Sequence, residues 1–281
     1  MSDLIVVPLD GSKNAENALP WAATLARLYN ATVEFVHVID DDGVEDPRDL
    51  SAATATFASH ASELANKWGL PAHDSRVLQG HPARTIVDVA AGARFIVIAS
   101  HGHGGFRAAF VGSVADKVIR NATVPALLVP AIGAPVAPDG RTVLVALDGS
   151  EAAESGLELA RDLARRLKST VTLLRAWTFL VQATGTFDSY YPSQEVFEAV
   201  ELAAKEYIAA KALPGEAAVV VMGPAVAAVG DVAARLDPEL VVVTTSGKGF
   251  AARIALGSTT ERLAHSLHRP LLIVPVAGRG R

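Results

Sequence analysis

The stretch Leu4-Ile-Val-Val-Pro-Leu-Asp-Gly-Ser12 returns later in the chain as Thr142-Val-Leu-Val-Ala-Leu-Asp-Gly-Ser150. Both copies are continuous apolar runs that end in Asp-Gly-Ser. Such a run is typical of a short strand buried on both faces, and Asp-Gly-Ser is typical of the tight turn after a strand. The chain therefore contains the start of the same folding unit twice.

Further segments repeat in the same order, about half of the 281 residues apart. The repeats of a solenoid recur roughly every 20 to 50 residues, so this period indicates a duplicated domain instead. Prolines and glycines between residues 131 and 140 mark the boundary. We expect a first domain at 1–133, a linker at 134–140 and a second domain at 141–281. The recurring segments are 32–38 with 170–176, 102–113 with 247–258, and 124–130 with 269–275.

Each half alternates apolar, strand-like runs with helical segments. This alternation predicts an α/β fold with two repeated, doubly wound parallel-sheet domains, because right-handed crossovers place helices on both faces of a parallel sheet. In the first half we expect strands at 4–9, 33–39, near 77, at 95–99 and at 126–129, and helices at about 12–29, 51–68, 82–91 and from 113 onward.

The composition narrows the class of protein. Lys and Arg number 25 against 30 Asp and Glu, which gives a formal net charge of -5. A chain without a basic field is not expected to bind nucleic acid or an anionic membrane. Cysteine is absent, which excludes disulfides and thiolate chemistry. No apolar run reaches the roughly 20 residues that cross a bilayer, and no signal peptide is indicated, so we expect a soluble protein.

The strongest candidate site is the loop Ser100-His-Gly-His-Gly-Gly-Phe-Arg-Ala-Ala-Phe-Val-Gly-Ser113, which follows a strand and opens a helix. Glycines let backbone amides approach an anion closely, and a helix N-terminus adds unpaired N–H groups. We interpret this loop, and its copy at 246–258, as phosphate-binding. The alternative is that Ser113-Val-Ala-Asp116 and Ser258-Thr-Thr-Glu261 are capping boxes without a ligand. Capping does not explain the glycines ten residues upstream.

Asp10 and Asp148 follow the first strand of each half. A carboxylate at the end of that strand can accept hydrogen bonds from ribose hydroxyls or a base. It can equally be a turn aspartate that bonds its own backbone. The residues leave both interpretations open.

Other motifs argue against metal sites and efficient turnover. His101 and His103 do not recur in the second copy, so a zinc site is not expected, and His265 and His268 stand where a helix ends, which favours a structural role. The sequence contains no Gly-x-x-x-x-Gly-Lys-[Ser/Thr], no Gly-x-Ser-x-Gly and no dinucleotide Gly-x-Gly-x-x-Gly after the first strand.

Taken together, Asp-Gly-Ser after strand one, Gly-x9-Gly-Ser after strand four and the final proline-bounded run resemble the universal stress protein family in its tandem two-domain form. The resemblance covers nearly the whole chain. It implies five-stranded domains of strand order 3-2-1-4-5, similar to adenine nucleotide alpha hydrolases, and a cytoplasmic location. It also implies ATP as the ligand, which a subset of members binds at Gly-x2-Gly-x9-Gly-[Ser/Thr].

The resemblance implies equivalent site residues in the two halves. The first glycine of the family pattern falls on Ala99 and on Thr244, and we expect the branched Thr244 to narrow the rim of the second site more than Ala99 narrows the first. Asp10 and Asp148 would face the ribose, and the backbones of Val38 and Ala176 the adenine. The phosphates would meet Gly102, Gly112, Ser113 and Val114 in the first half and Gly247, Gly257, Ser258 and Thr259 in the second.

The favoured function is ATP binding, with or without Mg²⁺, by a cytoplasmic stress-response protein with little or no hydrolysis. Two alternatives stay open: a non-nucleotide member that acts through partner surfaces, and a slow ATPase or autokinase. The prolines that bound 124–130 and 269–275 are typical of edge strands. Pairing these two edges would join the halves as a pseudo-dimer, and homodimerisation also stays open.

Overall fold

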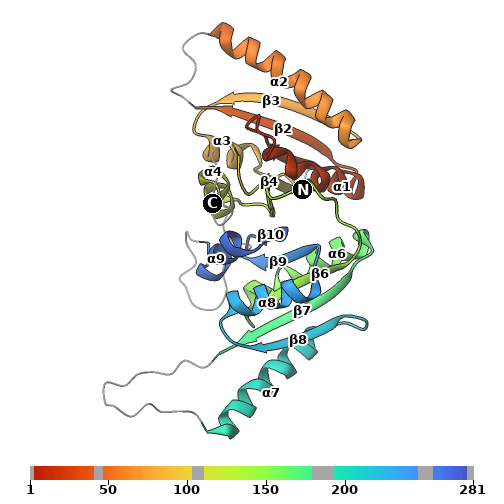
Figure 1. The fold of residues 1–281 in the computed structure, drawn as a ribbon, viewed down its shortest axis with the longest axis vertical. Coiled ribbons are helices and arrows are strands. Elements are labelled where there is room, and N and C mark those ends of the chain that lie inside the picture. The colour runs from red at the N-terminus through yellow and green to blue at the C-terminus, as the bar shows by residue number, and fades with distance from the viewer. Residues whose placement is uncertain (1–2, 41–46, 103–110, 179–192, 246–255, 277–281) are drawn as a thin grey trace, which may run out of the picture.

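The computed structural model of the protein describes residues 3–40, 47–102, 111–178, 193–245 and 256–276. The ten strands in these residues form one sheet in the order β3-β2-β1-β4-β5-β10-β9-β6-β7-β8. The strands succeed one another along the long axis of the molecule (Figure 1). Each half contributes five strands in the order 3-2-1-4-5. The predicted α/β class and doubly wound order are therefore confirmed.

The first half follows its predicted elements, with one difference at the first helix. Ser12 Oγ accepts a hydrogen bond from the amide of Ala15 at 3.2 Å, and a short 3-10 turn, η1 (Ala15–Ala18), precedes α1 (Leu19–Tyr29). Pro20 lies in the first turn of α1, where its missing N–H costs nothing. The remaining elements are β1 (Leu4–Pro8), β2 (Thr32–Ile39), α2 (Pro47–Trp68), β3 (His73–Gln79), α3 (Pro82–Val89), β4 (Phe95–Ala99), α4 (Ser113–Asn121) and β5 (Ala126–Val129).

The second half repeats this arrangement. Ser150 caps its first helix, with Oγ accepting from the amide of Ala153 at 3.0 Å, as Ser12 does for Ala15. The elements are β6 (Thr142–Leu147), α5 (Glu151–Glu154), α6 (Leu157–Leu167), β7 (Thr170–Trp177), α7 (Gln194–Lys211), β8 (Ala217–Met222), α8 (Ala225–Leu236), β9 (Leu240–Thr244), α9 (Ser258–Ser266) and β10 (Leu271–Val274).

The two halves join through β5 and β10, the proline-bounded runs that the sequence marks as edges. These strands are antiparallel, with Leu127 opposite Leu272 and Leu128 opposite Leu271, whereas all other pairs in the sheet are parallel. Neither edge is left unpaired, because each strand satisfies the backbone hydrogen bonds of the other. The pairing predicted within one chain is confirmed.

Helices cover both faces of the sheet, and each core continues across the seam between β5 and β10. On one face α1, α2, α6 and α7 pack over residues that include Leu127 and Leu272. On the other face α3, α4, α8 and α9 pack over residues that include Leu128 and Ile273. Strand side chains alternate between faces, so neighbouring residues of β5 contribute to different cores. The halves therefore share two continuous hydrophobic cores.

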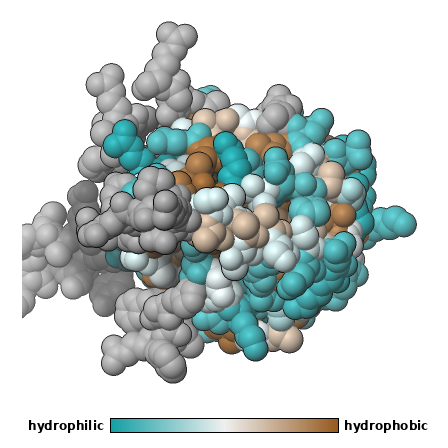
Figure 2. All heavy atoms as spheres, turned by 90° about the horizontal axis from the view of Figure 1, so that it is seen from above, coloured by the Kyte–Doolittle hydropathy of each residue, from teal (hydrophilic) through white to brown (hydrophobic). Residues whose placement is uncertain are grey.

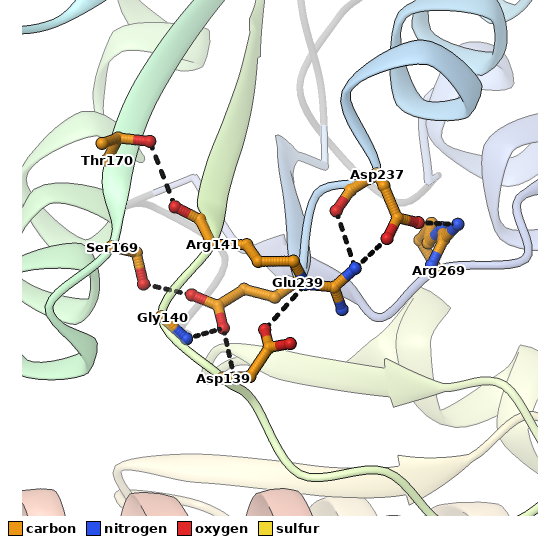
Figure 3. A network of polar contacts seen from close by, with 8 residues as sticks. All are labelled: Asp139, Gly140, Arg141, Ser169, Thr170, Asp237, Glu239 and Arg269. Atoms are coloured by element: carbon orange, nitrogen blue, oxygen red, sulfur yellow. Dashed lines mark hydrogen bonds and ion pairs between the residues drawn. The ribbon is translucent and has the colours of Figure 1, made fainter.

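The segment after β5 crosses to β6 without a helix or strand of its own. The carboxylate of Glu239, which is 3% exposed, accepts hydrogen bonds from the amides of Asp139 and Gly140, both at 2.9 Å (Figure 3). Arg141 donates from Nε to Asp139 Oδ1 at 2.7 Å. A buried carboxylate is stabilised by such charge-assisted bonds. The end of the connection is thus anchored at the start of β6 and β9.

The outer end of the first half is polar. The view from above in Figure 2 shows mainly hydrophilic side chains with small, separate hydrophobic areas. The edge strand β3 carries His73, Asp74 and Arg76, and charges on an edge strand discourage pairing with another chain. Among the described residues, no helix is long and apolar enough to cross a membrane.

Candidate functional site

The sheet places the sequence-predicted residues at the carboxyl ends of its parallel strands. β1 pairs with β2 on one side and with β4 on the other, so the winding reverses between β1 and β4. Asp10 follows β1, and Gly102 lies three residues after β4. In open α/β sheets the crevice at this reversal is the usual place for a ligand.

Asp10 and Gly102 are in close contact. A Cβ built on Gly102 would fall 1.9 Å from Oδ2 of Asp10 and 2.9 Å from its Cγ. A side chain at position 102 would displace the Asp10 carboxylate, so the glycine lets both residues keep these places at the strand reversal. The carbonyl of Gly102 also accepts a hydrogen bond from Asn14 Nδ2 at 3.1 Å. The structure therefore brings together the loop glycine and the aspartate that the sequence singled out separately.

Both aspartates shape the turn after the first strand. Asp10 Oδ1 accepts from the amide and the hydroxyl of Ser12, at 3.0 and 2.6 Å. Asp148 Oδ1 accepts from the same groups of Ser150, at 2.9 and 2.6 Å. This is the turn role that stayed open from the sequence, and it uses one oxygen of each carboxylate. The second oxygen of Asp10 lies toward Gly102.

The two outer glycines of the loops begin helices α4 and α9. The amide of Gly112 donates to the Ser100 carbonyl at 2.7 Å, and that of Gly257 donates to the Thr245 carbonyl at 2.6 Å. These bonds tie each helix start to the end of β4 or β9. The next two amides, of Ser113 and Val114 in α4, have no hydrogen-bond partner among the described residues. Both residues are exposed, so this helix N-terminus is open to an anion.

The capping boxes are not formed in the described residues. Helix α4 begins at Ser113 with Gly112 as its N-cap, and α9 begins at Ser258 with Gly257 as its N-cap, so the serines stand inside the helix rather than before it. Asp116 does not reach back to the turn but accepts from Arg120 Nε at 2.8 Å. The serine hydroxyls therefore do not occupy the site as caps.

The other predicted residues lie at the same edge. Val38, near the end of β2, is half-buried and packs on the core, and Ala176 near the end of β7 is half-buried. Val114 is 36% exposed, and Thr259 is exposed in the matching position of α9. Gly247 lies outside the described residues.

Two further pairs of side chains at this edge carry no sequence motif, although the repeat spacing could have found them. Ser100 and Thr245 each accept a backbone amide with the side-chain hydroxyl, from Ala131 at 3.0 Å and from Val276 at 3.3 Å. On strand two, His37 Nδ1 lies 2.8 Å from the Leu9 carbonyl, and Arg175 donates to the Leu147 carbonyl at 3.4 Å. Because a carbonyl only accepts, Nδ1 of His37 carries the proton. Asn14 has no such signal, because its counterpart is Ala152.

Thr244 does not occupy the place expected of it. A Cβ built on Gly156 would fall 3.1 Å from the methyl carbon of Thr244, so this methyl lies under the start of α6, and Thr244 is 8% exposed. Ala99 and Ala18 hold the equivalent positions in the first half. The methyl group of Thr244 therefore occupies the space next to Gly156, which has no side chain. The expectation that Thr244 narrows the rim therefore loses its steric basis.

The charged surroundings differ between the two sites. In the first half, burial and then the neighbouring His265 lower the pKa of His101, which favours its neutral form. In the second half, Glu154 accepts from Lys211 Nζ at 2.7 Å and from the Tyr207 hydroxyl at 3.0 Å. The bond from Lys211 lowers the pKa of Glu154, while burial opposes it, and burial followed by Glu154 raises the pKa of Tyr207. The second site is thus bordered by paired charges.

Within the described ranges, no three His, Cys, Asp or Glu side chains gather closely enough to hold a metal ion. The candidate site is instead built from backbone amides, glycines and one carboxylate in each half. Such groups suit a phosphorylated ligand.

Comparison with known proteins agrees with this arrangement. The sequence model of the universal stress protein family matches residues 1–130 and again residues 140–275. Universal stress proteins of Mycobacterium tuberculosis and Mycolicibacterium smegmatis are each 26% identical to the chain, over 288 and 305 residues. Both alignments cover 96% of this chain and 96% of the relative.

The fold has a solved counterpart of the same length. A universal stress protein from Archaeoglobus fulgidus superposes with a TM-score of 0.73 at 18% identity, over 98% of this chain and 99% of that chain. This likeness concerns the fold. With one family match in each half and relatives that align over nearly the whole chain, the protein belongs to the universal stress protein family and carries the family domain twice.

Proposed function

We propose that the protein binds ATP at the carboxyl edge of each half of the sheet, with little or no hydrolysis, as a cytoplasmic stress-response protein that holds or reports adenine nucleotide. The observation that carries the proposal is the close contact at the strand reversal between Gly102 and Asp10, where a Cβ at position 102 would displace the Asp10 carboxylate. A packing role alone does not require that contact at the strand reversal.

The residues at this edge fit the parts of a nucleotide. The exposed amides of Ser113 and Val114 at the start of α4 suit phosphate oxygens, because a helix N-terminus carries partial positive charge. Asp10 suits ribose hydroxyls as a hydrogen-bond acceptor, and the backbone of Val38 suits the adenine edge. Asp148, Ala176, Ser258 and Thr259 stand at the matching positions of the second half.

Little hydrolysis is expected because the sequence lacks the lysine-and-hydroxyl pattern that organises phosphate and Mg²⁺ in P-loop enzymes. Mg²⁺ would then reach the site only with the nucleotide. Phosphate release well above background, abolished by Asp10→Ala, would instead support a slow ATPase. A protein without any nucleotide affinity would support a member that acts through partner surfaces.

Paired glycine variants test the proposal in the full chain. A Cβ on Gly112 would lie 3.4 Å from the Ser100 carbonyl, a tight but tolerable contact, so Gly112→Val should fold while blocking the approach of phosphate. Gly257→Val is the matched variant of the second half. Calorimetric titration with ATP should give two sites in the wild type, one in each single variant and none in the double variant. Unchanged binding by Gly112→Val would contradict the site.

A second measurement addresses the ligand itself. Acid extraction of gently purified protein, followed by chromatography, would identify any nucleotide that stays bound. Adenine nucleotide is the expected result, and its absence from the double glycine variant would link it to these sites.

A further inference from the structure

Helices α4 and α9 lie on the two sides of the seam between the halves (Figure 1). Two polar side-chain contacts join them. Arg120 of α4 forms an ion pair with Glu261 of α9, with 2.6 Å between Nη2 and Oε1. His265 of α9 lies with Nε2 3.5 Å from Oδ1 of Asp116 in α4. Both contacts join the two helices. The second also places the imidazole of His265, from the second half, beside the candidate site of the first half.

His265 also holds a backbone amide of the first half. The N–H of Val111 donates to Nδ1 of His265 at 3.2 Å. Because Nδ1 accepts here, the proton of the neutral ring sits on Nε2, on the side of Asp116. His265 is 30% exposed in its side chain and lines a small cavity together with Ser100, His101 and Val111.

Val111 is the residue before the turn that opens α4. Its amide is held by His265, and the next amide, of Gly112, is held by the Ser100 carbonyl at 2.7 Å. Two consecutive bonds therefore fix the chain just before the exposed amides of Ser113 and Val114. Donors aimed at an anion bind it best when they need no reorganisation, so a bond that fixes their approach affects affinity.

The described residues of the second half contain no equivalent of this bond. At the repeat spacing of Gly112 and Gly257, His265 corresponds to Arg120 and Val111 corresponds to Leu256. A guanidinium carries only donors, so Arg120 cannot accept the amide of Leu256. It donates instead to Asp116 at 2.8 Å and pairs with Glu261. Both His265 and Arg120 make polar contacts across the seam. Of the two, only His265 bonds a backbone amide next to a candidate loop, that of Val111.

We propose that His265, from the second half, is a positioning residue of the first nucleotide site, where it holds the Val111 amide and so orients the Gly112–Val114 turn toward phosphate. This inference rests on the proposed function. It makes affinity at the first site depend on the seam between the halves, whereas affinity at the second site does not depend on His265.

Amide-for-imidazole variants test the role atom by atom. The side chain of Asn places an acceptor near the position of Nδ1, whereas Gln places one near the position of Nε2. In a Gly257→Val background, which leaves only the first site, His265→Ala and His265→Gln should weaken ATP binding about fivefold to tenfold, and His265→Asn should keep most of the affinity. Hydrogen exchange at the Val111 amide, measured without nucleotide, should become faster in the Ala and Gln variants and stay slow in the Asn variant.

Arg120→Ala is the matched control, because it removes a contact across the same seam without touching Val111. It should leave ATP affinity at the first site within about twofold of its parent, since solvent reaches the lost pair, with Arg120 30% and Glu261 40% exposed in their side chains. Equal weakening by Arg120→Ala, or unchanged affinity in His265→Ala, would overturn the positioning role while ATP binding itself stands. A parent protein that binds no ATP at the first site would overturn the proposed function, and this role with it.

Discussion

In their described residues the two candidate sites share the backbone bond that begins the helix, but different side chains support it. In both halves the amide of the loop glycine before the helix bonds the residue after strand four, at 2.7 Å for Gly112 and 2.6 Å for Gly257. In the first half Asn14 adds a bond to the Gly102 carbonyl at 3.1 Å, whereas the second half has Ala152 at the matching position. Equal motifs therefore do not mean equally supported sites.

The packing beneath the two sites differs at one pair of positions, where the second half has a smaller residue on its helix and a larger residue on its strand. The first half pairs Ala18 with Ala99, and the second pairs Gly156 with Thr244, whose methyl fills the space that a side chain at position 156 would take. Interiors are close-packed, so a larger residue on one element requires a smaller one opposite it. The two halves therefore share the backbone bond at the start of the helix after the loop, but they differ in how side-chain volume is divided between the two positions beneath it.

Separating the halves should have the largest effect. Residues 1–133 alone would expose β5, and residues 141–281 alone would expose β10, each with leucines that are 1% to 3% exposed in the full chain. Unpaired apolar edges pair with other strands, so we expect dimers or aggregates from both separated halves. Size-exclusion chromatography with light scattering checks this. Two stable, soluble monomers would mean that the seam is not required by either half.

The contact between Gly156 and Thr244 should affect the free energy of unfolding. Gly156→Ala puts a Cβ 3.1 Å from the Thr244 methyl carbon and should destabilise the protein by about 1–2 kcal/mol. No helix propensity offsets this, because Gly156 is the N-cap of α6, where glycine is preferred to alanine. The double variant Gly156→Ala/Thr244→Ala recreates the pair of the first half and should recover most of the loss. Urea unfolding of all four proteins gives the coupling, and purely additive effects would refute it.

The extra bond of the first site should be measurable as affinity. Asn14→Ala removes the donor to the Gly102 carbonyl and makes the position equal to Ala152, so ATP affinity at the first site should fall about fivefold. Titration in the Gly257→Val background isolates this site. Lys13→Ala, an exposed neighbour, serves as the control and should change affinity less. Equal losses in both variants would show that charge near the turn matters more than this bond.

The ion pairs beside the two sites should differ in their pH dependence. Glu154 pairs with Lys211, which is 35% exposed, and Glu16 pairs with Lys67, which is 58% exposed. The Lys211 bond, opposed by burial, lowers the pKa of Glu154, so its contribution is present above the ordinary value of 4.5 and is lost as the pH falls through the lowered pKa.

Glu154→Gln should therefore cost about 0.5–1 kcal/mol at neutral pH and progressively less in acid. Glu16→Gln is the matched variant and should cost less at neutral pH, because its partner is more solvated. Denaturant unfolding at neutral pH and below the carboxyl value of 4.5 compares the two. A cost of Glu154→Gln that persists unchanged in acid would assign it to packing.

The smallest effect on ATP affinity is expected at Thr244, where the sequence alone predicted a large one. Thr244→Ala gives the second half the residue found at position 99. If Thr244 narrowed the rim, ATP affinity at the second site would rise. Because the methyl lies against Gly156, we expect affinity within about twofold of the parent in the Gly112→Val background, with a modest loss of stability. A clear gain in affinity would restore the rim interpretation.

The sequence by itself determined the architecture. β4 and β5 have the bounds that their apolar runs predict, 95–99 and 126–129, and the repeat revealed two units of one fold. These features are readable because strand burial and turn chemistry are local properties, expressed by residues that are neighbours in the chain. Even the pairing of β5 with β10 could be predicted, because prolines at both ends of a run are an edge-strand signal, whereas the antiparallel direction came from the structure.

The candidate site was predictable in part. Asp10, Gly102 and Gly112 repeat in the second half and were found by that repetition. Asn14 and His265 do not repeat as the same residue, so the repeat gave no signal for their roles at the site.

Only the tertiary structure decided what supports each site. The bond between Val111 and His265 and the contact between Thr244 and Gly156 both join segments that are distant in sequence. Periodicity predicts which face of an element is buried, but not which side chain of another element meets it. The direction of the Thr244 methyl, and the imidazole that reaches from one half to the loop of the other, follow from how the duplicated units pack across their seam.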